Sequence, residues 1–181
     1  AYNTALGRFA LRNNTTANNQ TAVGYQALYS NVGGAGTNTA IGAQALYTNY
    51  NYTANVAVGY QALYSSNAAN NTAVGYQAGY SNTAGNNVFY GYQSGYGTTS
   101  GNNNTFLGFV AGNANTTGTG NTYVGNGAGY ATTGSNNTFI GAVNGSGSAC
   151  GSLVTTGSKN TILGGYTGNN GGLDIRTGSN Y

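Results

Sequence analysis

The stretch Asn71-Thr-Ala-Val-Gly-Tyr-Gln-Ala-Gly-Tyr80 decides the fold, because close copies of it recur along the whole chain. Each copy contains the element Asn-Thr-small-aliphatic-Gly, and self-similarity at a fixed period indicates a repeat architecture. Successive glycines of this element are 16 to 18 residues apart, except for a last step of 23 residues. We predict that they occupy turns, and they are Gly7, Gly24, Gly42, Gly59, Gly75, Gly91, Gly108, Gly125, Gly141 and Gly164.

The positions before the glycine keep a constant chemical character. Nine of the ten copies carry Asn four residues before it, so coils stacked about 4.8 Å apart would place Asn over Asn. Stacked identical amides form hydrogen-bonded ladders along an axis. We therefore predict an Asn ladder made of Asn38, Asn55, Asn71, Asn87, Asn104, Asn121 and Asn137.

The local pattern favours strands and turns. We expect two short strands in each repeat, one on either side of the glycine, because both stretches alternate in β-favouring residues. A repeated glycine indicates a positive φ or a close backbone approach. The intervals rich in Asn, Gly, Thr and Ser have turn chemistry, and this content disfavours helix.

A unit of about 17 residues cannot bury an apolar face alone, whereas stacked units bury a continuous core. The sequence thus predicts an all-β fold, a parallel β-solenoid or β-roll of about ten coils of 16–18 residues. We expect one array over residues 1–181, with an insertion at about 146–159. Small Val and Ala residues inside the coils predict a thin core, which favours association between chains.

The copies fall into two subtypes. The first reads Ala-Val-Gly-Tyr-Gln-Ala-Leu-Tyr, as at residues 22–29, and the second has Phe-Leu-Gly at 106–108 with a further glycine at Gly112. Bulk moves from Tyr25, after the glycine, to Phe106, before it, while Leu28 gives way to glycine. Because such exchanges keep the packed volume roughly constant, we predict one continuous core that is rearranged near residues 79–91.

The composition argues against an enzyme and against a resident cofactor. The chain has no His and a single carboxylate side chain, Asp174, so it lacks an acid/base pair and a Ser-His-Asp set. One carboxylate also cannot supply the oxygens that calcium prefers, so we expect no metal site. The Gly33–Gly36 stretch lacks the Lys and the Ser or Thr that accompany a phosphate-binding loop, and it is interpreted as a turn.

The charges are few and scattered. Arg8, Arg12, Lys159 and Arg176 form no cluster, so we expect no nucleic-acid binding. We also expect no membrane insertion, since no apolar run approaches the roughly 20 residues of a span. Asp174 and Arg176 are the one close opposite-charge pair, for which we expect a salt bridge between coils or chains.

Cys150 has no second cysteine to pair with inside the chain. A buried or tolerated thiol is the favoured interpretation, and a cross-link between chains is the alternative. The sequence also begins in mid-pattern without Met, which predicts a fragment or a processed product.

The tyrosines are expected to form axial rows. One row lies five residues after the glycines and comprises Tyr29, Tyr47, Tyr64, Tyr80, Tyr96 and Tyr130. A second row follows the glycines directly and comprises Tyr25, Tyr60, Tyr76 and Tyr92. Rings that carry hydroxyls suit wet interfaces, so the rows could bind host cell-surface glycans. We favour the alternative that they pack between chains.

Two segments resemble known repeats. Residues 71–80, and the tail Asn160-Thr-Ile-Leu-Gly-Gly-Tyr-Thr-Gly-Asn-Asn-Gly-Gly-Leu-Asp-Ile-Arg-Thr177, are similar to repeats of marine-phage tail-fibre proteins, many of which carry a C-terminal endosialidase-type chaperone. The units resemble less closely the Asn-Ser-Val-Ala-Ile-Gly repeats of YadA-like trimeric adhesin heads, which are left-handed parallel β-rolls. Both families are homotrimeric and extracellular. The repeat is longer than the adhesin one, so handedness is not carried over.

The resemblance implies a homotrimeric shaft segment of a virion tail fibre that acts in host attachment. Three alternatives stay open: a subunit that polymerises end to end into an extracellular filament, a surface adhesin or glycan-binding module, and, more remotely, an ice-binding face of Thr and Asn rows. A disordered Asn/Gly-rich segment is disfavoured by the regular aliphatic residue before the glycine.

Overall fold

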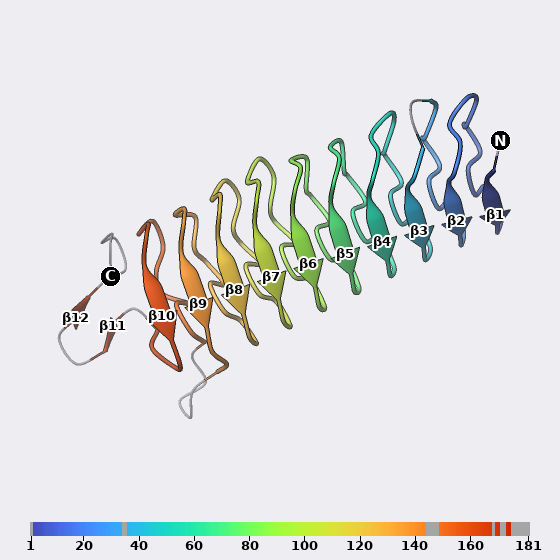
Figure 1. Ribbon diagram of the computed structural model, residues 1–181. Helices are drawn as coiled ribbons and strands as arrows, with labels where there is room; N and C mark the ends of the chain where they lie inside the picture. The colour runs from blue at the N-terminus through green and yellow to red at the C-terminus, as the bar shows by residue number, and fades with distance from the viewer. Residues whose placement is uncertain (1, 34–35, 144–148, 168, 171–172, 175–181) are drawn as a thin grey trace.

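The computed structural model describes residues 2–33, 36–143, 149–167, 169–170 and 173–174. Within them the chain forms a β-solenoid without helix, in which ten short strands stack in chain order into one parallel sheet (Figure 1). These strands are β1 (Thr4–Leu6), β2 (Thr21–Val23), β3 (Thr39–Ile41), β4 (Val56–Val58), β5 (Thr72–Val74), β6 (Val88–Tyr90), β7 (Thr105–Leu107), β8 (Thr122–Val124), β9 (Thr138–Ile140) and β10 (Thr161–Leu163). A small antiparallel pair, β11 (Asn169–Asn170) and β12 (Leu173–Asp174), follows. The predicted all-β parallel solenoid is confirmed.

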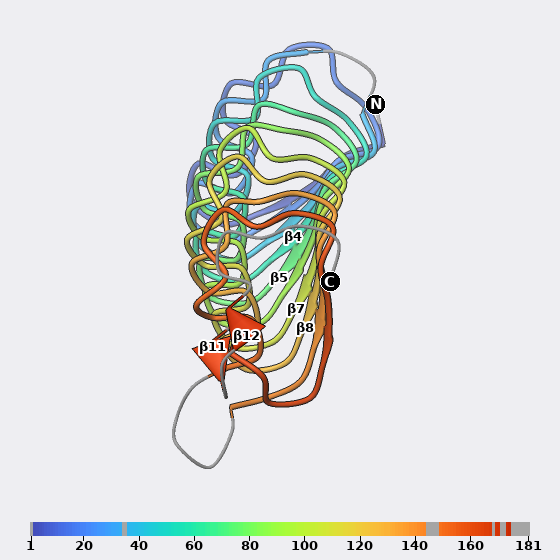
Figure 2. The ribbon, with the colours of Figure 1, turned by 90° about the vertical axis from the view of Figure 1, so that its left-hand side faces the viewer.

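The strands stack without slippage. Thr pairs with Thr or Val, the central residue with the central residue, and the last aliphatic with the next, as in β2 and β3. Viewed from the C-terminal end, coil lies over coil and the strands gather on one side of the stack (Figure 2). Because side chains alternate across a strand, the central residue points into the coil and its two neighbours point outward. In β2 the buried residue is Ala22.

The predicted second strand after the glycine is wrong. This stretch is a run of turns in which alternate residues have left-handed backbone, such as Gln26 at φ +55° and Leu28 at φ +50°. The Gln26 N–H donates to the Arg8 carbonyl of the preceding coil, and the Leu28 N–H donates to the Ala45 carbonyl of the next, both at 3.0 Å. The turns therefore satisfy their backbone groups between coils, as a strand would, without extended geometry.

From Gly7 to Gly125 the repeated glycines meet both expectations made for them, whereas Gly141 shows only the close approach and Gly164 only the positive φ. Gly24 has φ +132°, and a Cβ there would lie 2.6 Å from the carbonyl carbon and oxygen of Gly42 in the next coil. Such a contact with backbone cannot be relieved by a side-chain rotation. The glycine column is thus what allows successive coils to approach at sheet spacing.

The core has two forms. In the Ala–Leu region, from β2 to the turn after β4, a central Ala such as Ala57 faces a buried Leu, such as Leu63, four residues after the glycine. In the aromatic–Gly region, from β6 to the turn after β9, the strand centre is aromatic and the Leu position is Gly. The buried aromatic residues are Phe89, Phe106, Tyr123 and Phe139. Side chains of both regions belong to one continuous core cluster.

Direct contacts explain this exchange. A Cβ at Gly112 would lie 2.5 Å from the Phe106 ring, so the aromatic side chain occupies the space that a Leu would fill. The predicted change of cross-section near residues 79–91 is therefore confirmed. Tyr25, however, takes no part in it, because its side chain lies on the surface.

The structure corrects the insertion boundary. The Gly129 N–H donates to the Cys150 carbonyl, and the Lys159 N–H donates to the Ser135 carbonyl. These bonds hold residues 149–160 in the regular coil, over the turn and loop that follow β8. The extra residues of the last step therefore lie between Gly141 and Ala149, earlier than the predicted 146–159.

Candidate functional site

The structure brings the predicted Asn ladder into one buried column. Asn104 is typical: its Oδ1 accepts a hydrogen bond from the Asn121 N–H, and its Nδ2 donates to the Gly118 carbonyl, both at 2.9 Å. Each bond joins a side chain to backbone, whereas the sequence predicted amide-to-amide contacts. The column is only 0–1% exposed, so it holds the coils together and offers no ligand surface.

A second amide ladder was not predicted. Glutamines two residues after the glycine bond to one another directly along the axis, with Nε2-to-Oε1 distances of 2.8–3.0 Å. This Gln ladder comprises Gln26, Gln44, Gln61, Gln77 and Gln93. The fixed place of Gln two residues after the glycine was the available signal in the sequence. Each Gln is half-buried, so the ladder forms part of the surface.

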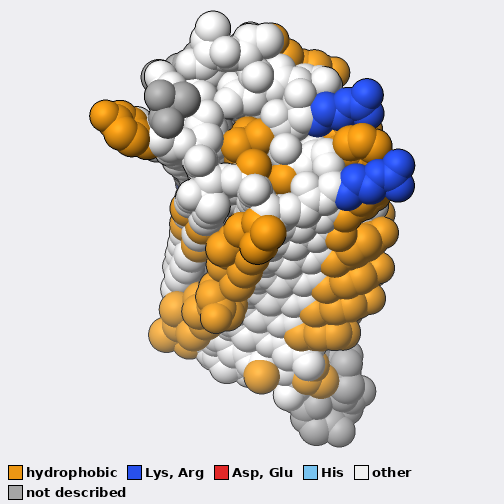
Figure 3. Space-filling view, turned by 90° about the vertical axis from the view of Figure 1, so that its right-hand side faces the viewer, with side chains coloured by type: hydrophobic (Ala, Val, Ile, Leu, Met, Phe, Trp, Pro, Cys, Tyr) orange, Lys and Arg blue, Asp and Glu red, His pale blue; other side chains and the backbone are white. Residues whose placement is uncertain are grey.

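The two tyrosine rows are stacks of rings. In the row five residues after the glycines, here called the Tyr29 row, Tyr29 to Tyr96 stack in sequence with centroids 5.0–5.1 Å apart. In the row directly after the glycines, the Tyr25 row, Tyr60 to Phe109 stack at 5.2–5.3 Å. Burial, and then the neighbouring Tyr47 and Tyr80, raise the pKa of Tyr64. Hydrophobic side chains form ridges along the solenoid in Figure 3.

Both rows are interrupted. Ala43 takes the place of an aromatic residue in the Tyr25 row, and Asn113 separates Tyr96 from Tyr130 in the Tyr29 row. Phe109 is followed in its row by Asn126. At the N-terminal end the rows begin with arginines, and the Arg12 guanidinium lies 5.8 Å from the Tyr29 ring centroid.

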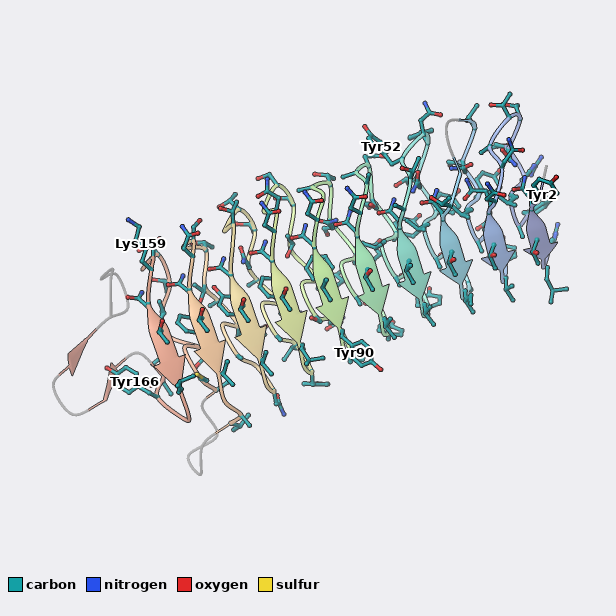
Figure 4. The ribbon with its side chains drawn as sticks, viewed as in Figure 1. Tyr2, Tyr52, Tyr90, Lys159 and Tyr166 are labelled. Carbon is teal, nitrogen blue, oxygen red and sulfur yellow. The ribbon has the colours of Figure 1, made fainter. Side chains whose placement is uncertain are left out.

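The outer sheet face is the third repeated surface. It consists of the Thr or Val at the start of each strand and the aliphatic residue, or Tyr90, at its end; the central residue of the strand points to the other side. The valines of the strands were predicted to lie inside the coils, but this is wrong, since from β2 to β10 only the central residue of the strand is buried. Ile41, Leu107 and Ile140 are 40–43% exposed. The side chains in Figure 4 show Tyr90 projecting outward from β6.

The ionisable core groups are inert at neutral pH. Cys150 lies in a core column that holds mostly alanines, and burial raises the pKa of its thiol to about 11. A thiol buried in this way is unsuited to a cross-link between chains. Burial also raises the pKa of Tyr123, whose hydroxyl lies near Thr132 and Asn137 without a hydrogen bond of good geometry.

Among the described residues there is no group of three His, Cys, Asp or Glu side chains that could hold a metal ion. The predicted pair of Asp174 with Arg176 lies outside the residues whose side chains are described. In the same part of the chain, no helix long and apolar enough to cross a membrane is present.

Comparison with known proteins adds no relative: no family model, no curated protein and no solved structure matches the chain.

Proposed function

We propose that the chain is a non-enzymatic structural segment, the shaft of a homotrimeric extracellular fibre of the phage tail-fibre type. The observation that carries the proposal is the outer sheet face, where each of the strands β1 to β10 ends in an aliphatic side chain, or in Tyr90 for β6, that the single chain leaves at least partly open to solvent. Nine intervals of about 4.8 Å make this face about 43 Å long. Contiguous apolar surface of this extent marks an association site.

A second and third copy of the chain are the occupants that fit this face best. It carries no charged residue, and its aliphatic side chains alternate with Thr hydroxyls that can hydrogen-bond at the wet edge of an interface. Because the column follows the solenoid axis, side-by-side copies would bury it over its whole length. Three copies around one axis form a closed, cyclic assembly.

The mechanical role follows from the inter-coil bonding. Every coil is joined to the next by the sheet, the Asn ladder and backbone bonds in the turns. Load along the axis is then shared by many parallel hydrogen bonds, which suits a spacer that holds another part away from a surface. The resemblance of residues 71–80 and 160–177 to tail-fibre repeats supports placing that spacer in a virion fibre that acts in host attachment.

The test is the absolute mass in solution by light scattering, with electron microscopy of the same sample. We expect three times the chain mass of 18.2 kDa, in the form of short rods. Val74→Asp should yield monomers, because it places an unpaired charge within the interface while its side chain points away from the core. The matched variant Asn67→Asp, on an exposed turn, should remain trimeric.

Two results would overturn the proposal. A monomeric parent chain would leave the outer sheet face without a partner. A mass that grows with concentration would favour the end-to-end filament. Circular dichroism of both variants shows whether the β signal is kept, so loss of assembly is distinguished from loss of the fold.

A further inference from the structure

The stacking of the tyrosines decides where a ligand can reach an aromatic ring. Neighbouring rings in the Tyr29 row are 2–12° from parallel, so each ring covers the face of the next. Only ring edges and hydroxyls then face solvent. Stacking against a ring face is possible only where a row is interrupted.

The two rows are interrupted in neighbouring coils, at Asn113 in the turn after β7 and at Asn126 in the turn after β8. Phe109, 53% exposed, stacks on Tyr92 on one side and has Asn126 as its neighbour in the next coil. Tyr130 is 44% exposed, and no ring among the described residues stacks on it, because Asn113 precedes it in its row and Ser152 follows it. The turn after β8 therefore presents a Tyr ring whose two neighbours in its row are both small polar residues.

A groove of about 480 Å³ lies at this place. It forms because two bulky positions of the earlier coils are small here: Asn126 replaces the Tyr of the Tyr25 row, and Gly127 replaces the Gln of the Gln ladder. Its volume falls within the roughly 300–1,000 Å³ of small-molecule sites. Its walls include Asn126, Gly127, Tyr130, Val143, Ser152 and Leu153, and we call it the Tyr130 groove.

The side chains around the groove define the class of ligand. All of the described residues that line it are uncharged, so they offer nothing to fix an ion. Tyr130, Val143 and Leu153 supply apolar surface, while the Asn126 amide and the Ser152 hydroxyl supply donors and acceptors. A sugar ring has the complementary form, with an apolar C–H face and a rim of hydroxyls.

We propose that the Tyr130 groove binds a neutral hexopyranose, such as the terminal sugar of a cell-surface glycan. The Tyr130 ring packs against the C–H face of the sugar, and Asn126 and Ser152 hydrogen-bond its hydroxyls. The site lies on the turns and does not use the outer sheet face. It thus goes beyond the role of a shaft, and its test is independent of the oligomeric state.

The experiment is saturation-transfer NMR on the whole chain with glucose, galactose, N-acetylglucosamine and N-acetylgalactosamine, each tested separately. We expect at least one sugar to give a signal, with weak affinity on the order of millimolar Kd. Tyr130→Ala removes the ring. Asn126→Tyr fills the groove with the residue found at the same place in earlier coils, where it can stack on Phe109, so the fold should tolerate it.

The control is Tyr52→Ala, which removes an exposed tyrosine from the loop before β4 (Figure 4). The signal should fall to the level of the blank in Tyr130→Ala and in Asn126→Tyr and should persist in Tyr52→Ala. Absence of signal for all four sugars with the parent chain refutes the proposal. So does a signal that survives both groove variants, or one that Tyr52→Ala also abolishes.

Discussion

The Ala–Leu region and the aromatic–Gly region fill the same coil in opposite ways. In the first, bulk comes from a Leu in the turn, such as Leu46 at φ +51°, a left-handed conformation that costs about 1–2 kcal/mol for a residue with a side chain. In the second, Gly112 adopts φ +59° without that strain, and the bulk comes from Phe106 on the strand. Equal volume can thus be supplied from either side of the core.

The two regions differ in the contacts that their core side chains make from one coil to the next. Aromatic residues at the strand centre stack on one another, with ring centroids 4.8 Å apart for Phe106 and Tyr123 and 5.0 Å for Tyr123 and Phe139. Such pairs contribute about 0.5–1.5 kcal/mol beyond the area they bury. Leucines offer no directional contact of this kind. The aromatic–Gly region therefore combines relief of strain with ring stacking.

The junction between the regions shows that the exchange operates between coils as well as within one. The coil of β5 has small residues at both positions, Ala73 and Gly79. Phe89 from the next coil fills that space, because a Cβ at Gly79 would lie 2.5 Å from its ring, and one at Gly95 would also meet it. One aromatic side chain thus serves two coils. The boundary should be movable if the residues are changed together.

The largest effects are expected from moving this boundary by one coil. Leu63→Gly alone leaves a cavity and should cost about 3–5 kcal/mol. Ala73→Phe alone overpacks the core against Leu63 and Phe89 and should cost about 1–3 kcal/mol or more. In the double variant Phe at 73 takes the bridging role of Phe89, so the losses should not add, with a coupling of at least about 2 kcal/mol.

Thermal unfolding followed by circular dichroism, at one protein concentration for all four chains, measures this cycle. Additive losses would show that the two regions are not alternative fillings of one core.

A smaller effect on stability is expected from replacing by Ala each of two glycines that share the same left-handed backbone conformation. Gly112 and Gly120 have φ +59° and +67°, so Ala at either position pays the same left-handed strain of about 1 kcal/mol. At Gly112 the new Cβ also meets the Phe106 ring, whereas at Gly120 it meets the end of the exposed Asn136 side chain. Gly112→Ala should therefore lose about 2–4 kcal/mol and Gly120→Ala about 1 kcal/mol.

The same unfolding measurement separates them. Equal losses in the two variants would mean that backbone strain, and not the aromatic filling, accounts for the glycines of the second region.

The period of the sequence was enough to predict the parallel stack, the glycine column and the exchange of Leu for Gly, because each depends on residues recurring at a fixed phase. The period could not predict which side of the three-residue strand faces the core. Thr-Ala-Val carries apolar residues on both sides, so the pattern does not say whether Ala22 or Val23 enters the core. The structure turns Ala22 inward and leaves Val23 on the outer sheet face.

Other misses have equally physical causes. A step of 23 residues gives the length of an insertion but not its place within the coil. Left-handed backbone at Gln26 and Leu28 is uncommon for such residues, so their alternation resembled a strand. The Tyr130 groove arises from side chains that are smaller than their counterparts, and a search for chemically active residues does not find a site of that kind.

The smallest expected effect is a fall in folding stability at alkaline pH, and it should come from the aromatic–Gly region. Cys150 occupies a column that holds Ala27, Ala45 and Ala62 in the Ala–Leu region. Its folded-state pKa of about 11 exceeds the unfolded value of about 8.5. Above pH 8.5 the unfolded chain releases this proton while the folded chain keeps it, so stability is unaffected below that pH and falls as the pH rises toward 11. Tyr123, whose pKa is also raised, extends the loss above pH 10.

Between pH 5 and 8 the unfolding temperature should be nearly flat, because the chain has no His and Asp174 is its one acidic side chain. Cys150→Ala should remove most of the decline in stability between pH 8.5 and 10, and Tyr123→Phe should change the slope of stability against pH only above about pH 10. At neutral pH Tyr123→Phe should gain about 1 kcal/mol, since it removes a buried hydroxyl that has no protein partner. An unchanged alkaline profile in both variants would mean that ionisation of Cys150 and Tyr123 does not cause the decline, and the pH response would then not belong to the aromatic–Gly region.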